Sequence, residues 1–396
     1  MVEFLPFRGL VPVLKNEAAI GRVSPPYDVI SPAELERWQS YPYNVTKITL
    51  GGKNGSYDDA GKMLGRWIAD GALAVEQKDC YYLYSQSFDE EGERLTRIGL
   101  VGILAATGYS PDGVIPHEET FSKVKEDRLN LLRGTETHCE SIFGIVDDLD
   151  DLLPDLRSCE AVIEYEDASG VEHKLVRIKE TKAVEKIRKR LADKRMLIAD
   201  GHHRYETSCR YAQENIGDRK KGFVLATIVA SNDPGMIVRP THRLLAGLKR
   251  SEDELVQALS KDFAVAKKMD LEEMLEAMAE SSGKDLGFVT RSGRYLILRP
   301  KDPVSDALKG LDTYVCEESI IKPLVLEDEG SKVAYDHDLS SVMSRLKAGE
   351  FDHAVILSPP SLDVIWEVAL DGKKMPKKST YFWPKMWSGM VYYRMK

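Results

Sequence analysis

The stretch that indicates the fold class reads LIADGHHRYETS and spans residues 197–208. Its apolar start followed by Asp-Gly predicts a short buried strand that ends in a tight turn, because glycine tolerates the backbone angles of such turns. Residues 209–214 then predict a helix. Five acidic or basic side chains lie between Asp200 and Glu206. A protein core cannot take up this mixture without partners, so the predicted strand–turn–helix junction is the first candidate site.

The side chains at the start of this predicted helix suit a phosphate group. Helix N-termini present free N–H groups and the positive end of the helix dipole, and Gly201 lets a ligand approach the backbone. Arg204 adds a planar guanidinium, which matches phosphate or carboxylate oxygens. His202 and His203 are candidates for phosphate binding and for acid/base catalysis, respectively. Neighbouring helical residues diverge by roughly 100°, so the two rings cannot face one ligand equally, which leaves a structural role open for one of them.

Two carboxylates extend the chemistry of the junction. Asp200 and Glu206 are predicted ligands of a divalent cation such as Mg²⁺, and Asp200 is also a candidate catalytic base. Phosphoryl transfer from ATP with Mg²⁺, metal-dependent hydrolysis and non-catalytic nucleotide binding by a regulatory protein therefore all remain open. The sequence has neither a Walker-A loop nor an H-E-x-x-H motif. A surplus of basic residues in the marked segments favours phosphate: Lys123, Lys125, Arg128, Arg133, Arg204, Arg243, Lys377 and Lys378.

A proline-rich loop near the N-terminus is the second candidate segment. Residues 25–31 read PPYDVIS, and the two prolines restrict the backbone to extended conformations. Ser31 is the predicted N-cap of a helix over residues 33–39. The loop either connects a strand to this helix or holds Tyr27 and Asp28 rigidly against a substrate, and both readings stay open.

A third segment places polar residues before and along a predicted helix over residues 126–133. His117 and Glu118 follow a proline just upstream, and we predict catalytic roles for both. Arg128 is a predicted phosphate ligand and Arg133 a predicted substrate ligand. The alternative is that this helix is a solvent-exposed, salt-bridged face.

Downstream, an apolar run over residues 222–230 predicts a buried strand. A turn and a return strand follow, and the end of this hairpin carries His242 and Arg243, which we predict to bind substrate. The arm at residues 375–389 combines lysines and hydroxyl side chains with four aromatic residues. It either packs across the core or forms a phosphate-binding loop, in which Lys378, Ser379 and Thr380 would contact the nucleotide.

The overall composition bounds the function. The chain has 396 residues and a formal net charge of −9, which argues against a nucleic-acid-binding protein. No apolar run is long enough to span a bilayer, and the N-terminus does not resemble a signal peptide, so we expect a cytoplasmic protein without membrane contact. Five scattered cysteines without a C-x-x-C pair predict reduced thiols.

Six sequence blocks, taken together, resemble domain-of-unknown-function family 1015. The Asp-Gly-His-His-Arg block is also similar to a phosphate-binding motif of the ParB/sulfiredoxin-like superfamily, where a strand meets a helix. The position of sulfiredoxin's reactive cysteine is His202 here, so sulfiredoxin chemistry is not implied, and no counterpart of ParB's DNA-binding helices is recognised. The six blocks are PPYDVIS (25–31), HEET (117–120), DR (127–128), ADGHHRYET (199–207), PTHR (240–243) and MPKKSTYF (375–382).

The resemblance implies an α/β protein with a mixed-sheet, ParB/sulfiredoxin-like core in residues 1–250. We expect residues 251–300 to form a small α/β insert and residues 301–396 to form a C-terminal segment whose arm returns to the core. Through relatives of the family, the resemblance also implies that this chain is an ATP-dependent kinase of small molecules. Free L-serine is then the best candidate substrate, and O-phosphoserine would be the product. A nucleotide and a small molecule would then be the partners of this chain.

Overall fold

The computed structural model describes residues 2–14, 18–51, 56–120, 122–149, 151–281, 284–302 and 306–396. Helix α4 begins at Ser122, but the side chains of residues 122–124 lie outside this description, and with them Lys123, one of the basic residues that favour phosphate in the sequence. The chain forms two compact units. Unit 1 comprises residues 1–116, 120–237 and 384–396, and unit 2 comprises residues 117–119 and 238–383. Among the described residues, no helix has both the length and the apolarity needed to cross a bilayer.

Unit 1 is built on a nine-stranded mixed sheet, which confirms the predicted α/β class with a mixed sheet. Its strand order is β6-β11-β8-β12-β5-β4-β10-β9, and β1 pairs with β5. The pairs β11–β6 and β12–β8 are parallel, and the other pairs are antiparallel. The strands of the sheet are β1 (Phe4–Leu5), β4 (Tyr81–Glu90), β5 (Glu93–Ala105), β6 (Val114–Ile115), β8 (Ile142–Val146), β9 (Glu160–Glu166), β10 (Glu172–Ile178), β11 (Met196–Asp200) and β12 (Phe223–Ala230).

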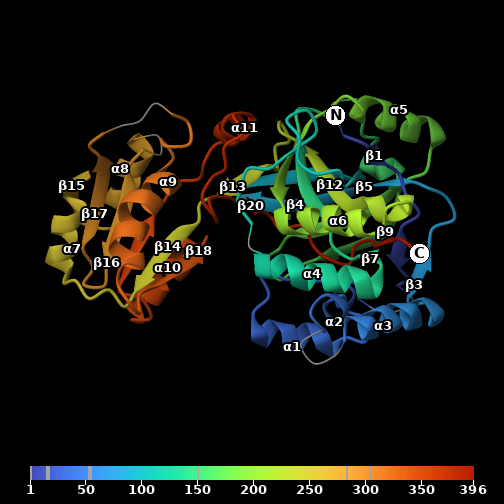
Figure 1. Cartoon of the computed structure of the whole chain (residues 1–396), viewed down its shortest axis with the longest axis horizontal. Coiled ribbons are helices and arrows are strands. Elements are labelled where there is room, and N and C mark those ends of the chain that lie inside the picture. The colour runs from blue at the N-terminus through green and yellow to red at the C-terminus, as the bar shows by residue number, and fades with distance from the viewer. Residues whose placement is uncertain are drawn as a thin grey trace. The chain divides into compact units, whose positions relative to one another are not determined.

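Helices α6, α4 and α3 of unit 1 lie in successive layers on one side of this sheet, whereas α5 lies apart from them (Figure 1). Helix α6 packs against α4, and α4 packs against α3. The predicted N-cap Ser31 is present at α1, and it forms a capping box with Glu34, in which each side chain accepts the other residue's backbone N–H. The helices are α1 (Pro32–Ser40), α2 (Thr46–Thr49), α3 (Tyr57–Ala69), α4 (Ser122–Thr135), α5 (Thr181–Leu191) and α6 (His202–Glu214); the remaining paired strands are β2 (Leu10–Pro12) with β3 (Leu73–Val75), and β7 (Thr137–His138) with β21 (Tyr393–Arg394).

The central strands of unit 1 explain its stability. All eight residues of β12 are buried, as the apolar run predicted, and four of the five residues of β11 are buried. Their side chains join one apolar cluster with residues of β4, β5, β8 and α5. Burying a single large aliphatic side chain contributes roughly 1.5–3 kcal/mol, so this cluster holds the end of β11 in a fixed place.

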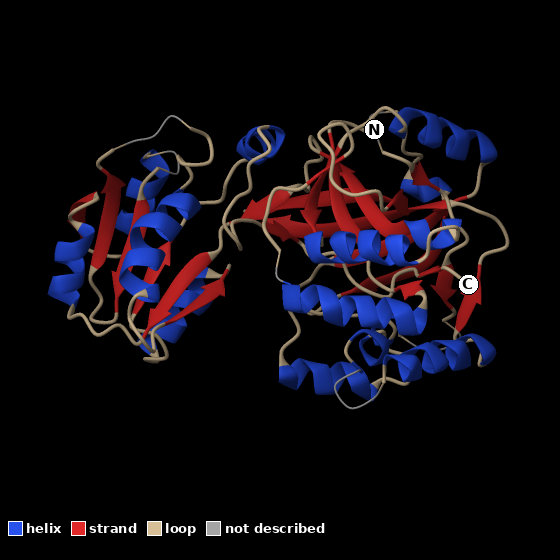
Figure 2. Cartoon of the chain, in the orientation of Figure 1, coloured by secondary structure: helices blue, strands red, loops and turns tan. Residues whose placement is uncertain are grey.

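Unit 2 contains a six-stranded antiparallel sheet with helices packed against it (Figure 2). The strand order is β15-β17-β16-β19-β14-β18. The sheet strands are β14 (His242–Ala246), β15 (Phe263–Lys268), β16 (Leu286–Thr290), β17 (Tyr295–Pro300), β18 (Lys332–Asp336) and β19 (His353–Ile356), and a separate pair joins β13 (Ile237–Arg239) to β20 (Tyr381–Trp383). The helices are α7 (Glu252–Leu259), α8 (Leu271–Glu280), α9 (Asp312–Cys316), the π-helical segment Glu317–Leu326, α10 (Leu339–Lys347) and α11 (Leu362–Leu370).

The predicted segment boundaries differ from these units. Residues 251–300 supply β15, β16 and β17, but these strands pair into one sheet with β14, β18 and β19 and therefore do not form a separate insert. The physical reason is that β16 hydrogen-bonds to β19, a strand about 60 residues further along the chain. The C-terminal segment is also divided, because residues 301–383 belong to unit 2 and residues 384–396 belong to unit 1.

Candidate functional site

The predicted strand–turn–helix junction lies at the end of β11 in unit 1. Gly201 has φ = 93°, a left-handed conformation that glycine adopts without strain, and helix α6 begins at the next residue. Among the described residues no side chain caps this helix. A Cβ atom at Gly201 would lie 3.0 Å from the guanidinium of Arg204, so the glycine also makes room for this side chain.

The carboxylate of Asp200 pairs with two cationic side chains at the junction. Arg204 Nη2 donates to Asp200 Oδ2 at 2.7 Å, and Arg204 Nη1 donates to the backbone oxygen of Ser141 at 2.5 Å. Lys385 Nζ donates to the other oxygen, Asp200 Oδ1, at 3.1 Å. Only 12% of the Arg204 side chain and 13% of the Lys385 side chain are exposed. The fold therefore holds an ammonium and a guanidinium together beside the first turn of α6.

Asp200 stays ionised in this environment. Burial alone would raise the pKa of its carboxyl, but the charges of Lys385 and Arg204 outweigh burial and hold the pKa below its ordinary value. A carboxylate with a lowered pKa takes up a proton poorly near neutral pH. This argues for a role of Asp200 in orienting the two cations, while the predicted roles as base and metal ligand remain untested.

An aromatic and basic wall lies near Arg204. The Arg128 guanidinium lies 4.4 Å from the centre of the Tyr27 ring, which places the proline-rich loop beside α4. The pKa of Tyr27 is raised above its ordinary value, chiefly by burial, while the charge of Arg204 acts in the opposite direction and that of Asp28 in the same direction. Tyr27, Asp28, Arg128 and Arg204 thus share one region of unit 1, whereas Asp28 itself is exposed.

A cavity of about 40 Å³ adjoins this wall. Arg128, His138, Glu140 and Arg204 contribute its charged or titratable side chains. Arg128 Nη1 and His138 Nε2 are buried and have no hydrogen-bond partner among the described residues. A water molecule needs roughly 10–15 Å³ of such space, so the cavity has room for a few waters that would satisfy both atoms.

The other predicted metal ligand, Glu206, is held in a separate network. Its Oε2 accepts from Lys125 Nζ at 2.9 Å and from Thr120 Oγ1 at 2.8 Å, and its Oε1 accepts from Tyr109 Oη at 3.2 Å. Asp200 instead pairs with Arg204 and Lys385, so the two carboxylates belong to different networks. Within the described ranges no group of three or more His, Cys, Asp or Glu side chains is placed to hold a metal ion.

The two histidines of the motif differ in burial. His202 is 6% exposed, whereas His203 is half-buried. This agrees with the prediction that neighbouring helical positions cannot face one ligand equally. The assigned roles of His202 in binding and His203 in catalysis stay predictions.

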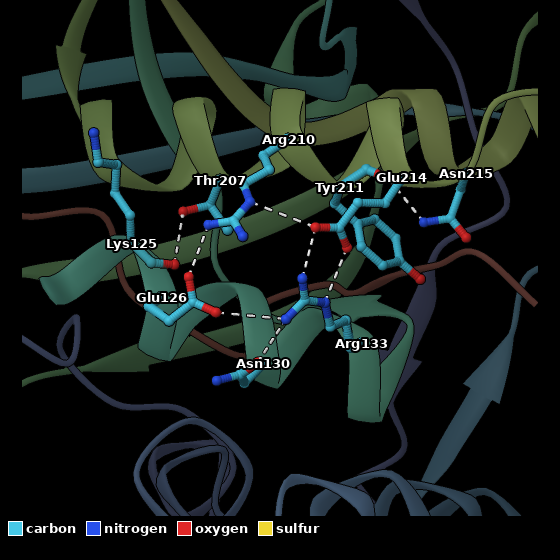
Figure 3. A network of polar contacts seen from close by, with 9 residues as sticks. All are labelled: Lys125, Glu126, Asn130, Arg133, Thr207, Arg210, Tyr211, Glu214 and Asn215. Carbon is cyan, nitrogen blue, oxygen red and sulfur yellow. Dashed lines mark hydrogen bonds and ion pairs between the residues drawn. The ribbon is translucent and has the colours of Figure 1, made fainter. Parts of the chain in front are cut away.

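Arg133 belongs to a surface network between α4 and α6, as Figure 3 shows. It donates to both oxygens of Glu214 at 2.9 and 2.6 Å and to Asn130 Oδ1 at 2.8 Å. Arg210 pairs with Glu126 at 2.7 Å in the same network. For Arg133 this arrangement favours the salt-bridged-face interpretation of the helix over the substrate-binding one.

Unit 2 brings two other predicted blocks together. Glu118 Oε1 accepts from the backbone N–H of Lys378 at 3.1 Å, and His117 Nε2 shares a hydrogen bond of 3.0 Å with Thr380 Oγ1. Ser379 Oγ donates to the backbone oxygen of Pro376 at 2.6 Å. Lys378 has φ = 60°, so this loop is held in a left-handed conformation that non-glycine residues rarely adopt. His117 and Glu118 therefore form one local structure with residues 378–380.

The hairpin residues lie at the start of β14, beside this loop of unit 2. Arg243 is buried, and its Nη1 donates to the backbone oxygens of Thr241 and of Lys378, the latter at 3.1 Å. His242 Nδ1 accepts from the backbone N–H of Leu357 at 3.2 Å. Burial, followed by the charge of Arg243, lowers the pKa of His242 to about 4, so this ring is neutral at physiological pH. Their predicted substrate-binding roles stay predictions.

Sequence reasoning missed two residues of the junction. Lys385 lies within the basic and aromatic arm at residues 375–389, in which the sequence predicts phosphate contacts only for the Lys-Lys-Ser-Thr block. Glu140 lies near Arg204 and Arg128 and accepts from Ser388 Oγ at 2.8 Å. The proline that precedes Lys385, flanked by four aromatic residues, was the available signal for a fixed and buried lysine.

The chain matches one protein family over most of its length. The model of the DUF1015 family, described as protein of unknown function, matches residues 4–314. This range contains five of the six sequence blocks, and the MPKKSTYF block lies beyond it. No curated protein matches the chain.

Several solved structures are similar in part. A conserved hypothetical protein from Pyrococcus furiosus is 14% identical, with a TM-score of 0.39 over 69% of this chain and 88% of that one. A free serine kinase in complex with AMP is 16% identical, with a TM-score of 0.41 over 69% and 85%. SbnI from Staphylococcus aureus, with a C-terminal truncation, is 10% identical, with a TM-score of 0.39 over 72% and 84%. At these values the similarity bears on neither ligand nor activity.

Proposed function

Since the chain belongs to the DUF1015 family, whose description gives no activity, we propose a function from its own residues. Unit 1 binds the phosphate groups of ATP at the start of α6, and the protein transfers a phosphoryl group to the hydroxyl of a small molecule. Free L-serine is the first candidate substrate, because the sequence resemblance implies it. The observation that carries the proposal is the pairing of both Arg204 and Lys385 with Asp200 beside an uncapped helix N-terminus.

The chemistry of the junction fits phosphate. Phosphoryl transfer has little covalent chemistry for a protein to perform, so positioning and charge stabilisation dominate. The guanidinium of Arg204 and the ammonium of Lys385 are kept in place before any ligand arrives, because Asp200 already orders both side chains. A preorganised cation loses less conformational entropy on binding than a solvated one.

The proposed reaction transfers the γ-phosphoryl group of ATP to a hydroxyl oxygen of the substrate. The bond between the γ-phosphorus and the oxygen that remains on ADP breaks, a new bond forms between this phosphorus and the substrate hydroxyl oxygen, and the hydroxyl proton passes to a base. Asp200 is a poor base, because its pKa is lowered by Lys385 and Arg204 despite burial. His203, Glu118 and His117 remain the predicted acid/base residues, and the part of the proposal that concerns phosphate binding does not depend on them.

Mg²⁺ is part of the proposal because it commonly bridges nucleotide phosphates. Bound ion would neutralise charge on the transferred phosphoryl group. Both oxygens of Asp200 are engaged by cations, and no three-carboxylate or histidine cluster exists in the described part of the chain. The residues therefore fit an ion that arrives with the phosphates, held by one or two carboxylates at most. Metal-dependent hydrolysis by an all-protein metal cage has no comparable support.

A second candidate is nucleotide binding without turnover, in a regulatory protein. The lowered pKa of Asp200 favours it, because this carboxylate of the junction is not suited to accept a proton. Both candidates predict ATP binding at α6. They differ in whether ADP is formed when a hydroxyl substrate is present.

The test is an ADP-release assay with ATP, Mg²⁺ and a panel of amino acids and small alcohols. Arg204→Lys keeps the charge but loses the planar fork, so we expect the catalysed rate to fall on the order of tenfold or more. Arg210→Ala is the matched control, because it lies on the same helix and its side chain is 54% exposed. Stoichiometric ATP binding without ADP formation on any substrate would leave the regulatory candidate. Absence of ATP binding in the wild-type protein would refute both.

A further inference from the structure

The last residues of the sequence form a strap across unit 1. Over residues 384–396, backbone hydrogen bonds join Ser388 to Ser24, Gly389 to Cys139, Tyr392 to Leu10 and Met395 to Glu136. The strap aromatics Trp387, Tyr392 and Tyr393 are buried. Since both edges of the strap are bonded, its backbone has one defined position.

Two side chains of the central sheet fix the start of this strap. Gln86 Nε2 donates to the backbone oxygen of Lys385 at 2.9 Å, and Arg97, which is fully buried, donates to the backbone oxygen of Pro384. Arg97 also donates to Gln86 Oε1 at 2.5 Å, which couples the two anchors. A buried arginine is costly to desolvate, so its use here to hold two carbonyl groups indicates a demand for accurate placement of this backbone.

The anchored backbone delivers the Lys385 side chain to the start of α6. Its ammonium meets Asp200 together with Arg204, so one carboxylate contacts two cations. One cation is enough to neutralise a carboxylate, and a lysine presents three donors. A second cation at this place is therefore explained better by a ligand than by the stability of the fold.

The cavity beside Arg204 gives an independent indication of a ligand or ordered water in the same region. Arg128 is 8% exposed and lines this cavity, and its buried Nη1 has no hydrogen-bond partner among the described residues. The nearby negative groups are Asp127, which pairs with Arg128 at 2.5 Å, Glu140, which interacts with both Arg128 and Arg204, and Asp28. Three largely buried cations, Arg128, Arg204 and Lys385, thus gather around the first turn of α6.

We infer that Lys385 is a phosphate-binding residue, and that residues 384–396 complete the nucleotide site of unit 1. This inference deepens the proposed function and rests on it. Asp200 orients the ammonium, and the ligand class is a nucleoside di- or triphosphate, whose phosphate oxygens accept from Lys385 Nζ. The match to the DUF1015 family ends at residue 314, so the family match does not include this lysine.

The test compares ligand binding by three full-length variants. Lys385→Met removes the charge, and Lys385→Arg keeps it. Lys396→Met is the matched control, because Lys396 lies in the same strap, pairs with Glu136 at 3.0 Å and is 49% exposed. ATP, pyrophosphate and adenosine are titrated into each protein by calorimetry, and thermal unfolding is recorded in parallel.

We expect Lys385→Met to weaken ATP binding on the order of 10- to 100-fold, as for a lost charge-assisted hydrogen bond, while adenosine binding is unchanged. Lys385→Arg should bind ATP within a few-fold of wild type, and Lys396→Met should match wild type. A merely structural lysine would weaken ATP and adenosine binding equally, or would not affect either, and both results overturn the inference. If Lys385→Met fails to fold, the salt dependence of ATP binding by Lys385→Arg is measured instead. A phosphate contact of residue 385 keeps this salt dependence, whereas a purely structural role does not require it.

Failure of the proposed function gives a different result. In that case the wild-type protein binds neither ATP nor pyrophosphate, and no variant needs to be compared. If the wild-type protein and Lys385→Met bind ATP with equal affinity, only the role of Lys385 is overturned, and the nucleotide site stays in place.

Discussion

The buried carboxyl of Asp312 makes unit 2 sensitive to pH. Asp312 is the first residue of α9, is 3% exposed, and accepts from the backbone N–H of Ser358 at 2.5 Å. Burial raises its pKa from 3.8 to about 7, although the Ser358 N–H and the charge of Arg243 act in the opposite direction. The folded protein therefore prefers the protonated acid.

The sign of the effect follows from this preference. The stabilisation is fully present below the unfolded pKa near 3.8 and is lost as the pH rises through about 7. The whole interval corresponds to about 4 kcal/mol at roughly 1.36 kcal/mol per pKa unit. Between about pH 5 and about pH 7.5 the free energy of unfolding should fall by about 2.5 kcal/mol because of this group.

Asp312→Asn is the perturbation that isolates this contribution. Asparagine keeps an oxygen that accepts from Ser358 but cannot ionise. Hydrogen exchange of the six-stranded sheet, measured by mass spectrometry, reports the free energy of opening of unit 2 at each pH. The difference in this opening free energy between variant and wild type should change by about 2.5 kcal/mol over this pH range. The opposite contribution of His242 is the same in both proteins and drops out of the difference. Asp253→Asn, whose side chain is 91% exposed, should show no such change. A pH-independent difference for Asp312→Asn would refute the reasoning.

Four further predictions concern single contacts. Gly201→Ala should cost about 1–2 kcal/mol in urea unfolding and weaken ATP binding, because φ is 93° and the new Cβ would displace Arg204. Wild-type unit 1 should lose up to about 3 kcal/mol between about pH 7.5 and pH 4, because burial lowers the pKa of His138 to about 4 and the unfolded chain takes up the proton first; His138→Gln should remove this part of the change in thermal unfolding curves. Arg133→Ala should change stability by less than about 1 kcal/mol and leave ADP release unaltered, and a loss of activity would restore its substrate role. Ser251→Ala should speed hydrogen exchange in α7 through a loss of about 1 kcal/mol, since it removes a capping box; unchanged exchange would contradict the cap.

The local elements of unit 1 could be predicted from the sequence. The apolar runs of β11 and β12, the Asp-Gly turn and the Ser31 cap each follow from a few neighbouring residues, and the structure confirms them. Such features depend on backbone preferences and hydrophobic periodicity, which act over short distances along the chain.

The division into units could not be predicted in this way. It depends on which strands hydrogen-bond, and β16 pairs with β19 across a long stretch of sequence that carries no local signal of the partnership. The contact between Lys385 and Asp200 spans 185 residues and is likewise set by the path of the strap. Charge patterns identified the arm as basic, but only the anchors at Gln86 and Arg97 select which lysine reaches the junction.

The position of the strap also sets an order of events during synthesis. A ribosome makes residues 384–396 after all of residues 238–383, so the body of unit 1 emerges long before the segment that carries Lys385. Asp200 and Arg204 are therefore made before Lys385, and the candidate site lacks this lysine while unit 2 is translated. Lys385 is therefore the last of these three residues to be made, and a product truncated within residues 238–383 would retain the helix α6 but lack the ammonium that contacts Asp200.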